Sequence, residues 1–206
     1  MIKVKLMDGS ILEVEQGSTI LEVAKKISEG LARNATCGSI NGKVEDLRYS
    51  INEDCDLVIH TFKEDDLEGK QAYWHTTSHI MAQAVSRLFP NVKFAIGPSI
   101  ENGFYYDFDV EKPFTDEDKS KIEDEMKKII KENIKIERFS LPKKEALELM
   151  KDQPYKQELI NELPEGEEIS FYKQGDFTDL CAGPHLESTG KVKIVKILSS
   201  SGAYWR

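Results

Sequence analysis

Two pairs of residues in this chain have the types and the spacing to act at one chemical site. His75 and His79 lie four residues apart in QAYWHTTSHIMAQAVSRLF, which is predicted to be a helix, so their imidazoles project from one face. Cys181 and His185 are also four residues apart, in the loop-like segment CAGPH. Imidazoles and thiolates bind zinc, and imidazoles also activate and orient water. The residue types therefore fit either a metal site or a hydrolytic pocket.

Each pair alone says little, because a histidine pair at this spacing is more often structural than functional. Their joint occurrence is more informative, since three of the four histidines and one of the three cysteines fall into two short clusters. The remaining histidine, His60, lies at the end of the strand-like segment DLVIHTF and is expected to be structural. Cys37 and Cys55 are expected to be small core or turn residues.

Charged residues near these clusters are further candidates for the site. Asp179 precedes Cys181 by two residues, which places both side chains on one face of an extended segment. Lys156 stands at the start of a predicted helix, where a lysine does not favour the helix dipole. An exposed lysine is the alternative interpretation of that position.

Gly97 and the neighbouring pair Tyr105 and Tyr106 are also candidates for the site. Gly97 offers backbone without a side chain, so a ligand could approach closely there. Tyr105 and Tyr106 follow the turn sequence ENGF in a predicted strand. Alternation along a strand sends one of these rings to the core and the other outward.

The composition limits the classes of function. The chain has 206 residues, enough for one large domain or two small ones. Its formal net charge of −9 argues against a protein that coats nucleic acid non-specifically, although a local RNA pocket remains compatible. Three widely spaced cysteines imply no disulfide framework, which fits a reducing cytosol. We find no signal peptide and no apolar run approaching the roughly 18 residues of a bilayer span, so a cytoplasmic protein without membrane contact is expected.

Residues 1–62 are expected to form a β-grasp module of ubiquitin size. The segments IKVKLM and SILEVE alternate on either side of an Asp-Gly hairpin signal. The segment GSTILEVAKKISEGL predicts one helix, opened by a capping box of Thr19 and Glu22. A turn at Asn41-Gly42 and a final strand in DCDLVIHTF complete the module.

Residues 63–206 are expected to form a second, α/β domain. The charged segment KEDDLEGK leads as a linker into the long helix with His75 and His79. Two strands joined by ENG, an amphipathic helix in PFTDEDKSKIEDEMKKIIKEN, and the strand IKIERFSL follow. Two short helices and a strand then lead into the CAGPH loop, and KVKIVKIL is predicted to be a final strand. The fold class is thus α+β.

The motifs HTTSH, AIGPSIENGFYYDFDV, YKQEL, DLCAGPHLESTGKV and GAYWR together resemble the N-terminal region of bacterial threonyl-tRNA synthetases. The resemblance covers essentially the whole chain. It implies that residues 1–62 are a TGS domain, which is a β-grasp module, and that residues 63–206 are an editing domain. The HxxxH and CxxxH motifs are shared with alanyl-type editing domains, whereas IENGFYYDFDV and GAYWR are more specific to the threonyl family.

The resemblance implies that the whole synthetase joins threonine to tRNA(Thr) with ATP, and that this region hydrolyses mischarged Ser-tRNA(Thr). It carries the editing residues over to His75, His79, Tyr106, Lys156, Asp179, Cys181 and His185. His75 and Lys156 are then expected to be catalytic, by positioning and polarising the attacking water. The other five, together with Gly97, are expected to bind the substrate.

The resemblance also implies the cofactors and partners. No metal is expected in this region, whereas ATP, magnesium and zinc belong to the aminoacylation core of a whole synthetase. The partner is the 3′ end of tRNA(Thr) carrying serine. A homodimer is expected for the whole synthetase and a monomer for this chain. Two alternatives stay open: an alanyl-type hydrolase with zinc on His75, His79, Cys181 and His185, and a non-catalytic TGS module that binds RNA or regulates.

Overall fold

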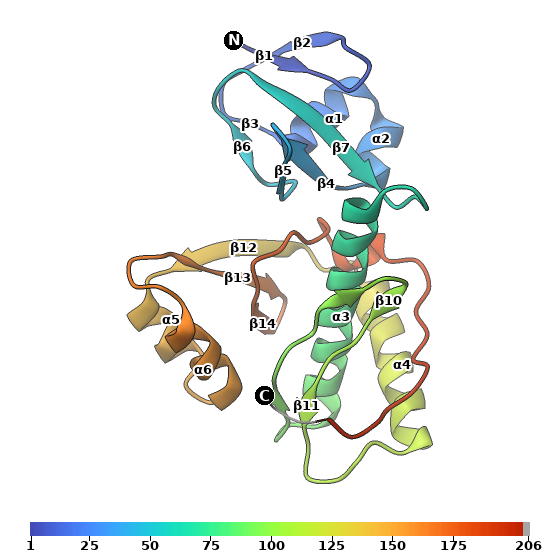
Figure 1. Cartoon of the computed structure of the whole chain (residues 1–206). Helices are drawn as coiled ribbons and strands as arrows, with labels where there is room; N and C mark the ends of the chain where they lie inside the picture. The colour runs from blue at the N-terminus through green and yellow to red at the C-terminus, as the bar shows by residue number, and fades with distance from the viewer. Residues whose placement is uncertain (204–206) are drawn as a thin grey trace. The chain divides into compact units, whose positions relative to one another are not determined.

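The structure is a computed structural model that describes residues 1–203, and the chain divides into two compact units (Figure 1). Unit 1 comprises Met1–His75 together with Gly183–Glu187, and unit 2 comprises Thr76–Ala182 and the residues from Ser188 onward. Three residues of the GAYWR motif, Tyr204, Trp205 and Arg206, lie outside the described residues. No helix within residues 1–203 is both long and apolar enough to cross a bilayer.

Unit 1 is built on a mixed five-stranded sheet in the order β2-β1-β7-β4-β5. Its strands are β1 (Ile2–Lys5), β2 (Ile11–Val14), β4 (Ala35–Ile40), β5 (Lys43–Glu45) and β7 (Cys55–Thr61). β1 and β7 are parallel, whereas the two hairpins β1–β2 and β4–β5 are antiparallel. Asn41 and Gly42 turn the second hairpin with φ of 50° and 84°, as the Asn-Gly signal predicts. The β-grasp prediction is confirmed.

The helical segment of unit 1 differs from the sequence prediction. One helix was expected, but α1 (Ile20–Ile27) ends at Ser28 and α2 (Glu29–Asn34) begins there, because the Ser28 hydroxyl accepts from the Leu31 amide and caps the second helix. The capping box of Thr19 and Glu22 is confirmed at the start of α1. Buried residues of α1 pack with the sheet into one core, on the side of the sheet where Figure 1 shows both helices. The short strands β3 (Ser18–Thr19) and β6 (Ser50–Ile51) form a separate two-stranded antiparallel sheet.

The long helix α3 (Leu67–Leu88) contains both histidines of the HTTSH motif, as predicted. In unit 2 it runs beside α4 (Asp116–Glu132), to which Arg87 connects it through Glu125 at 3.2 Å (Figure 1). α4 begins with a capping box of Thr115 and Asp118.

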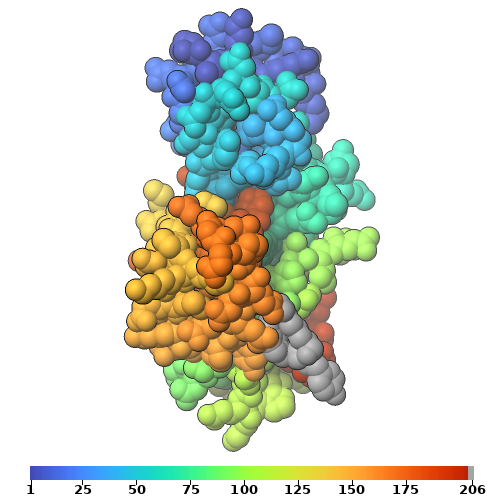
Figure 2. Space-filling view, turned by 60° about the vertical axis from the view of Figure 1, so that its left-hand side comes forward, coloured from blue at the N-terminus to red at the C-terminus, as the bar shows by residue number. Residues whose placement is uncertain are grey.

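A three-stranded sheet in unit 2 leads into the CAGPH segment, which follows its last strand in the sequence. Its order is β12 (Ile136–Leu141), β13 (Ile169–Gln174) and β14 (Phe177–Leu180), all antiparallel. Two short helices, α5 (Lys143–Leu149) and α6 (Pro154–Glu162), connect β12 to β13 and form part of the surface drawn in Figure 2. α6 turns Lys156 and Ile160, four residues apart, into the interior.

The central segment of unit 2 is an interrupted ribbon. β8 (Lys93–Phe94) pairs with β11 (Phe108–Asp109), and β9 (Ser99–Ile100) pairs with β10 (Gly103–Phe104).

The final strand predicted in KVKIVKIL is wrong. A 3₁₀ turn (Thr189–Lys191) begins this segment, and residues 192–203 have no regular structure. Two of its apolar side chains, Ile194 and Leu198, are 83% and 86% exposed. Val192 and Val195 are buried, but within the described residues no strand pairs with the segment, and an alternating pattern becomes a strand only with such a partner.

Candidate functional site

A buried carboxylate, Asp179, is the centre of a charged cluster in unit 2. Its Oδ1 lies 2.9 Å from the Lys156 ammonium, and its Oδ2 lies 3.2 Å from Nδ1 of His79. The hydroxyl of Tyr106 donates to Oδ2 at 2.6 Å. The Asp179, Lys156 and His79 side chains are at most 4% exposed, so this is an interior site and not a solvated surface pair.

The surroundings decide the charge states in this cluster. Burial by itself would raise the pKa of Asp179, but the Lys156 charge, the His79 charge and the hydrogen bonds from Tyr106 and Lys156 outweigh it and hold that pKa below its ordinary value. Burial and the Asp179 charge, with the hydrogen bond to Asp179, raise the pKa of Tyr106 well above its ordinary value. Asp179 is therefore an anion at neutral pH, and Tyr106 is a neutral hydrogen-bond donor.

Each member of the cluster is placed by a different element of unit 2. β14 alternates, so Phe177 and Asp179 face inward. The first turn of α6, which begins with Pro154, sends Lys156 into the interior. The Tyr106 ring stacks at 4.8 Å on Phe108, and its neighbour Tyr105 is 40% exposed, which confirms that only one of the two rings faces the core.

Gly97 lies beside this cluster for a steric reason. A Cβ added at Gly97 would come within 2.1 Å of the Tyr106 ring, so the missing side chain is what admits the ring. The Gly97 carbonyl accepts a hydrogen bond from the Ser78 hydroxyl of α3 at 2.7 Å. The observed neighbour of Gly97 is thus a protein ring, and its expected contact with substrate stays a prediction.

Polar side chains of α3 are buried in unit 2, and sequence analysis did not single them out. Gln83 donates to the Gln174 carbonyl at 3.0 Å, and the Gln174 side chain returns to Gln83 at 2.8 Å and to the His79 carbonyl at 3.3 Å. These hydrogen bonds connect the turn of α3 that contains His79 to β13. The signal in the sequence is the polar run TTSH, followed by Gln83 as a further polar residue within the mostly apolar run IMAQAV.

The other two histidines of the motifs belong to unit 1. The rings of His75 and His185 are 4.8 Å apart, centroid to centroid, at 54°. His185 is fully buried, whereas His75 is half-buried at the end of the α3 turns that belong to this unit. Half-burial leaves His75 with a path to solvent, which a residue that handles water requires.

Cys181 follows β14 in unit 2, is buried and forms no disulfide. Its amide donates to the Ser170 carbonyl at 3.1 Å and its carbonyl accepts from the Ser170 hydroxyl at 2.5 Å, so the backbone here continues the ladder of β13 and β14. Asp179 and Cys181 are both buried at alternate positions, as the spacing predicts.

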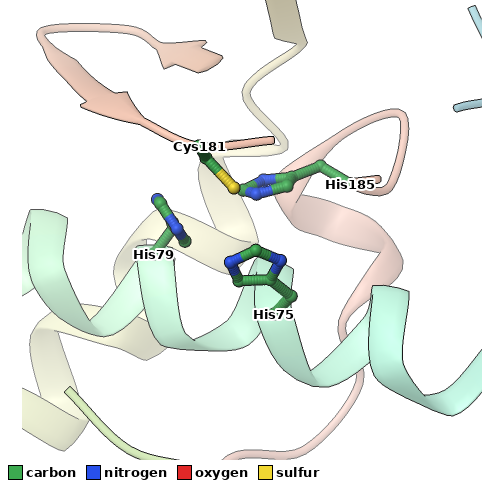
Figure 3. A group of neighbouring side chains, drawn as sticks. All are labelled: His75, His79, Cys181 and His185. Carbon is green, nitrogen blue, oxygen red and sulfur yellow. The ribbon is translucent and has the colours of Figure 1, made fainter. Parts of the chain in front are cut away.

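By residue type, His75, His79, Cys181 and His185 could hold a metal ion (Figure 3). Figure 3 shows His75 and His79 extending from the same side of α3, and Cys181 and His185 extending from the segment after β14. The His79–Asp179 contact resembles the carboxylate that commonly orients a metal-bound imidazole, so this part of the donor set fits a zinc ion. The buried Lys156 ammonium on the same carboxylate adds a positive charge, which disfavours a divalent cation.

A second group of possible metal ligands lies in unit 1, and its contacts are structural. Asp66 accepts at Oδ1 from the Gly69 amide at 3.0 Å and so caps the start of α3. The same oxygen lies 2.8 Å from Nδ1 of His60, whose Nε2 lies 2.7 Å from the Ser39 hydroxyl. This chain of contacts joins the helix start to β4 and β7, and it includes the histidine that was expected to be structural.

Comparison with known proteins adds two domain matches. The profile of the TGS domain matches residues 2–61. The profile described as the Threonyl and Alanyl tRNA synthetase second additional domain matches residues 169–203, which include Asp179, Cys181 and His185. The chain therefore contains a TGS domain and part or all of a second additional domain of the threonyl and alanyl type.

Similar proteins were found over the whole chain. It is 65% identical over 206 residues to the threonine–tRNA ligase of Clostridium perfringens, 64% identical over 208 residues to that of Acetivibrio thermocellus, and 62% identical over 208 residues to that of Clostridioides difficile. All of this chain, but only 32% of each relative, is covered. The chain thus corresponds to the N-terminal region of bacterial threonine–tRNA ligase and spans about a third of its length.

Proposed function

We propose that this chain hydrolyses serine wrongly esterified to the 3′ end of tRNA(Thr). The observation that carries the proposal is the buried cluster of Lys156, Asp179, His79 and Tyr106, part of which lies in the matched second additional domain. A buried ammonium on a buried carboxylate is costly to maintain, and such perturbed ionisable groups concentrate at functional sites.

In this mechanism a water molecule attacks the carbonyl carbon of the seryl ester, and the ribose oxygen leaves with a proton, giving free serine and intact tRNA. His75 accepts the proton of the attacking water, since it is a half-buried imidazole. Lys156 stabilises the negative charge that develops on the carbonyl oxygen. Asp179 fixes the Lys156 ammonium at 2.9 Å and so preorganises it.

The remaining cluster residues bind the substrate. A carboxylate offers about four lone-pair sites, and contacts with Lys156, His79 and Tyr106 use three of those on Asp179. We propose that Asp179 also accepts from the ammonium group of serine. His79 contacts Asp179 through Nδ1, and we propose that it also binds the terminal ribose. We propose that Cys181, His185 and Gly97 also contact the substrate.

The substrate preference follows from size. Serine lacks one methyl group of threonine, and a synthetic pocket that admits threonine rejects serine by only about 10–200-fold. A second pocket that sterically excludes this methyl group admits serine alone. Direct attack by water is preferred over attack by the Cys181 thiol, because a thiol that is only 8% exposed is poorly accessible for nucleophilic attack.

The proposal is tested with Ser-tRNA(Thr) and three variants. His75→Ala and Lys156→Met are each expected to slow hydrolysis by about 100-fold or more, since each removes a group acting on the transition state. Lys144→Met replaces an exposed lysine of α5 and is expected to leave the rate unchanged. A folded wild-type chain that leaves the seryl ester intact, or variants as active as wild type, would favour the TGS binding-module reading.

A zinc-dependent hydrolase of the alanyl type is the second candidate, since the donor set fits the ion by type. In that case His75, His79, Cys181 and His185 would hold zinc, which would supply an activated water. We propose the metal-free route because of the Lys156 charge beside His79. Hydrolysis that persists after dialysis against a chelator supports this route. Hydrolysis that stops with the chelator and returns with zinc, or activity on mischarged tRNA(Ala), supports the alternative.

We further propose that the whole protein is a homodimeric, cytoplasmic class II threonine–tRNA ligase that uses ATP, magnesium and zinc in a core beyond these residues. The similarity to threonine–tRNA ligases over all of this chain supports this. We propose a boundary between the TGS and editing domains near residue 62, and the TGS match to residues 2–61 supports it. This chain alone is expected to be monomeric.

A further inference from the structure

The segment Gly183–Glu187, which carries His185, packs as part of unit 1. Its backbone is held there by Arg48. One guanidinium nitrogen of Arg48 donates to the His185 carbonyl at 3.3 Å, and the other donates to the carbonyls of Leu186 at 2.8 Å and Glu187 at 3.3 Å. Three successive carbonyls of one segment are therefore bound by one side chain.

Asp46 completes this arrangement from the same turn. Its Oδ2 accepts from the His185 amide at 3.2 Å, and its Oδ1 accepts from the Arg48 guanidinium at 2.7 Å and from the Arg48 amide at 2.9 Å. The two residues thus hold the backbone of His185 on both its N–H and its C=O. We define Asp46 and Arg48 as the clamp.

The clamp stands on a rigid part of the β-grasp unit. Leu47, between its two members, is 1% exposed and belongs to the core of unit 1. The carbonyls of Leu47 and Tyr49 accept from the amides of Leu21 and Ile20, in the first turn of α1. A shift of the clamp would therefore break helix capping bonds and core packing, which makes the clamp a stable support for the segment.

We propose that Asp46 and Arg48 are positioning residues for His185, so that the TGS part of the chain orients a residue of the hydrolytic site. The side chain of His185 is fully buried with its ring 4.8 Å from that of His75, and its direction is fixed by the backbone that the clamp holds. The proposal rests on the proposed hydrolysis for its effect on rate. The planar fork of arginine matches several carbonyls at once, which a lysine ammonium does not reproduce.

The first test measures amide hydrogen exchange at His185 in the 206-residue chain. Arg48→Ala and Arg48→Lys are expected to speed exchange of the His185 amide at least tenfold, while amides of β4 and β7 keep their protection and report an intact fold. Arg138→Ala, which removes an exposed arginine of β12, is the matched control and should change nothing. Unchanged exchange at His185 in both Arg48 variants overturns the proposal, whatever the activity.

The second test asks whether the clamp acts through His185. On Ser-tRNA(Thr), Arg48→Ala is expected to lower kcat by about 10–100-fold with little change in KM, because a small misplacement of a site residue can cost about 100-fold in rate. In a His185→Ala background, Arg48→Ala should cause no further loss. Additive losses overturn the positioning role. A wild-type chain without hydrolysis overturns the proposed function instead, and the exchange measurement still decides the clamp.

Discussion

Asp179 is expected to stabilise the fold as well as to act in the proposed site. It binds Lys156, His79 and Tyr106 in the interior, where an ion pair is stable only if both partners remain. Asp179→Asn removes the anion and leaves a buried ammonium. We expect a loss of about 3–5 kcal/mol in the free energy of unfolding, measured by urea denaturation at pH 7. Asp152→Asn, at an exposed position, is the control.

The difference in the free energy of unfolding between wild type and Asp179→Asn should depend on pH. Because the pKa of Asp179 is lower in the folded chain than its ordinary value of 3.8, the folded state favours the carboxylate. The stability it contributes is fully present above about pH 3.8 and is lost as the pH falls through the folded pKa. The gap between wild type and Asp179→Asn should therefore be constant near neutral pH and shrink below pH 3.8. A gap that is the same at pH 7 and pH 3 would contradict this charge assignment.

Sequence reasoning at this scale named Lys156 and Asp179 but did not predict their pairing. A lysine in the first turn of a short helix is ordinarily exposed, and its burial depends on β14 lying within reach, which no local pattern encodes. The helix dipole made Lys156 a candidate, and the resemblance assigned it a catalytic role. Asp46 and Arg48 escaped selection altogether, since a turn residue and an arginine two positions later carry no local sign of a distant segment.

At the scale of elements, the interrupted ribbon β8–β11 places Tyr106 against Asp179. Gly97 makes room for that ring, and Ser78 of α3 holds the Gly97 carbonyl. Gly97→Ala would place a methyl group 2.1 Å from the ring. We expect the ring to be displaced, with a loss of about 1–3 kcal/mol in stability and a lower rate of seryl ester hydrolysis.

A matched control lies in the same ribbon. Gly103 of β10 has nothing within 4 Å of an added Cβ, so Gly103→Ala is expected to leave both the melting temperature and the hydrolysis rate unchanged. If Gly97→Ala behaves like Gly103→Ala, the Tyr106 ring has room that the structure does not show, and its place in the cluster is wrong.

Most elements were predictable because their signals are local. The Asn41-Gly42 turn, the capping box of Thr19, and the helices α3 and α4 all confirm the sequence pattern. Two predictions, the single helix in GSTILEVAKKISEGL and the strand in KVKIVKIL, were wrong for different reasons. Ser28 caps a new helix within an unbroken apolar pattern, and KVKIVKIL alternates without a partner strand.

At the scale of the whole molecule, the chain joins two units of different character through the continuous helix α3. Residues 1–62 carry seven basic and ten acidic side chains, which fits poorly with strong, general attraction to RNA. The clamp on His185 gives this TGS part a role that needs no RNA contact. Sequence analysis anticipated two domains, but not that a five-residue segment after Ala182 packs with the first.

The most direct test compares the deacylation rates of Ser-tRNA(Thr) and Thr-tRNA(Thr) by this chain, with Lys156→Met beside wild type. We expect the seryl ester to be hydrolysed at least about tenfold faster than the threonyl ester, since the proposed pocket excludes the extra methyl group. We also expect Lys156→Met to abolish the faster reaction. Equal rates for the two esters, or a seryl rate that survives in Lys156→Met, would contradict hydrolytic editing by the buried cluster around Asp179.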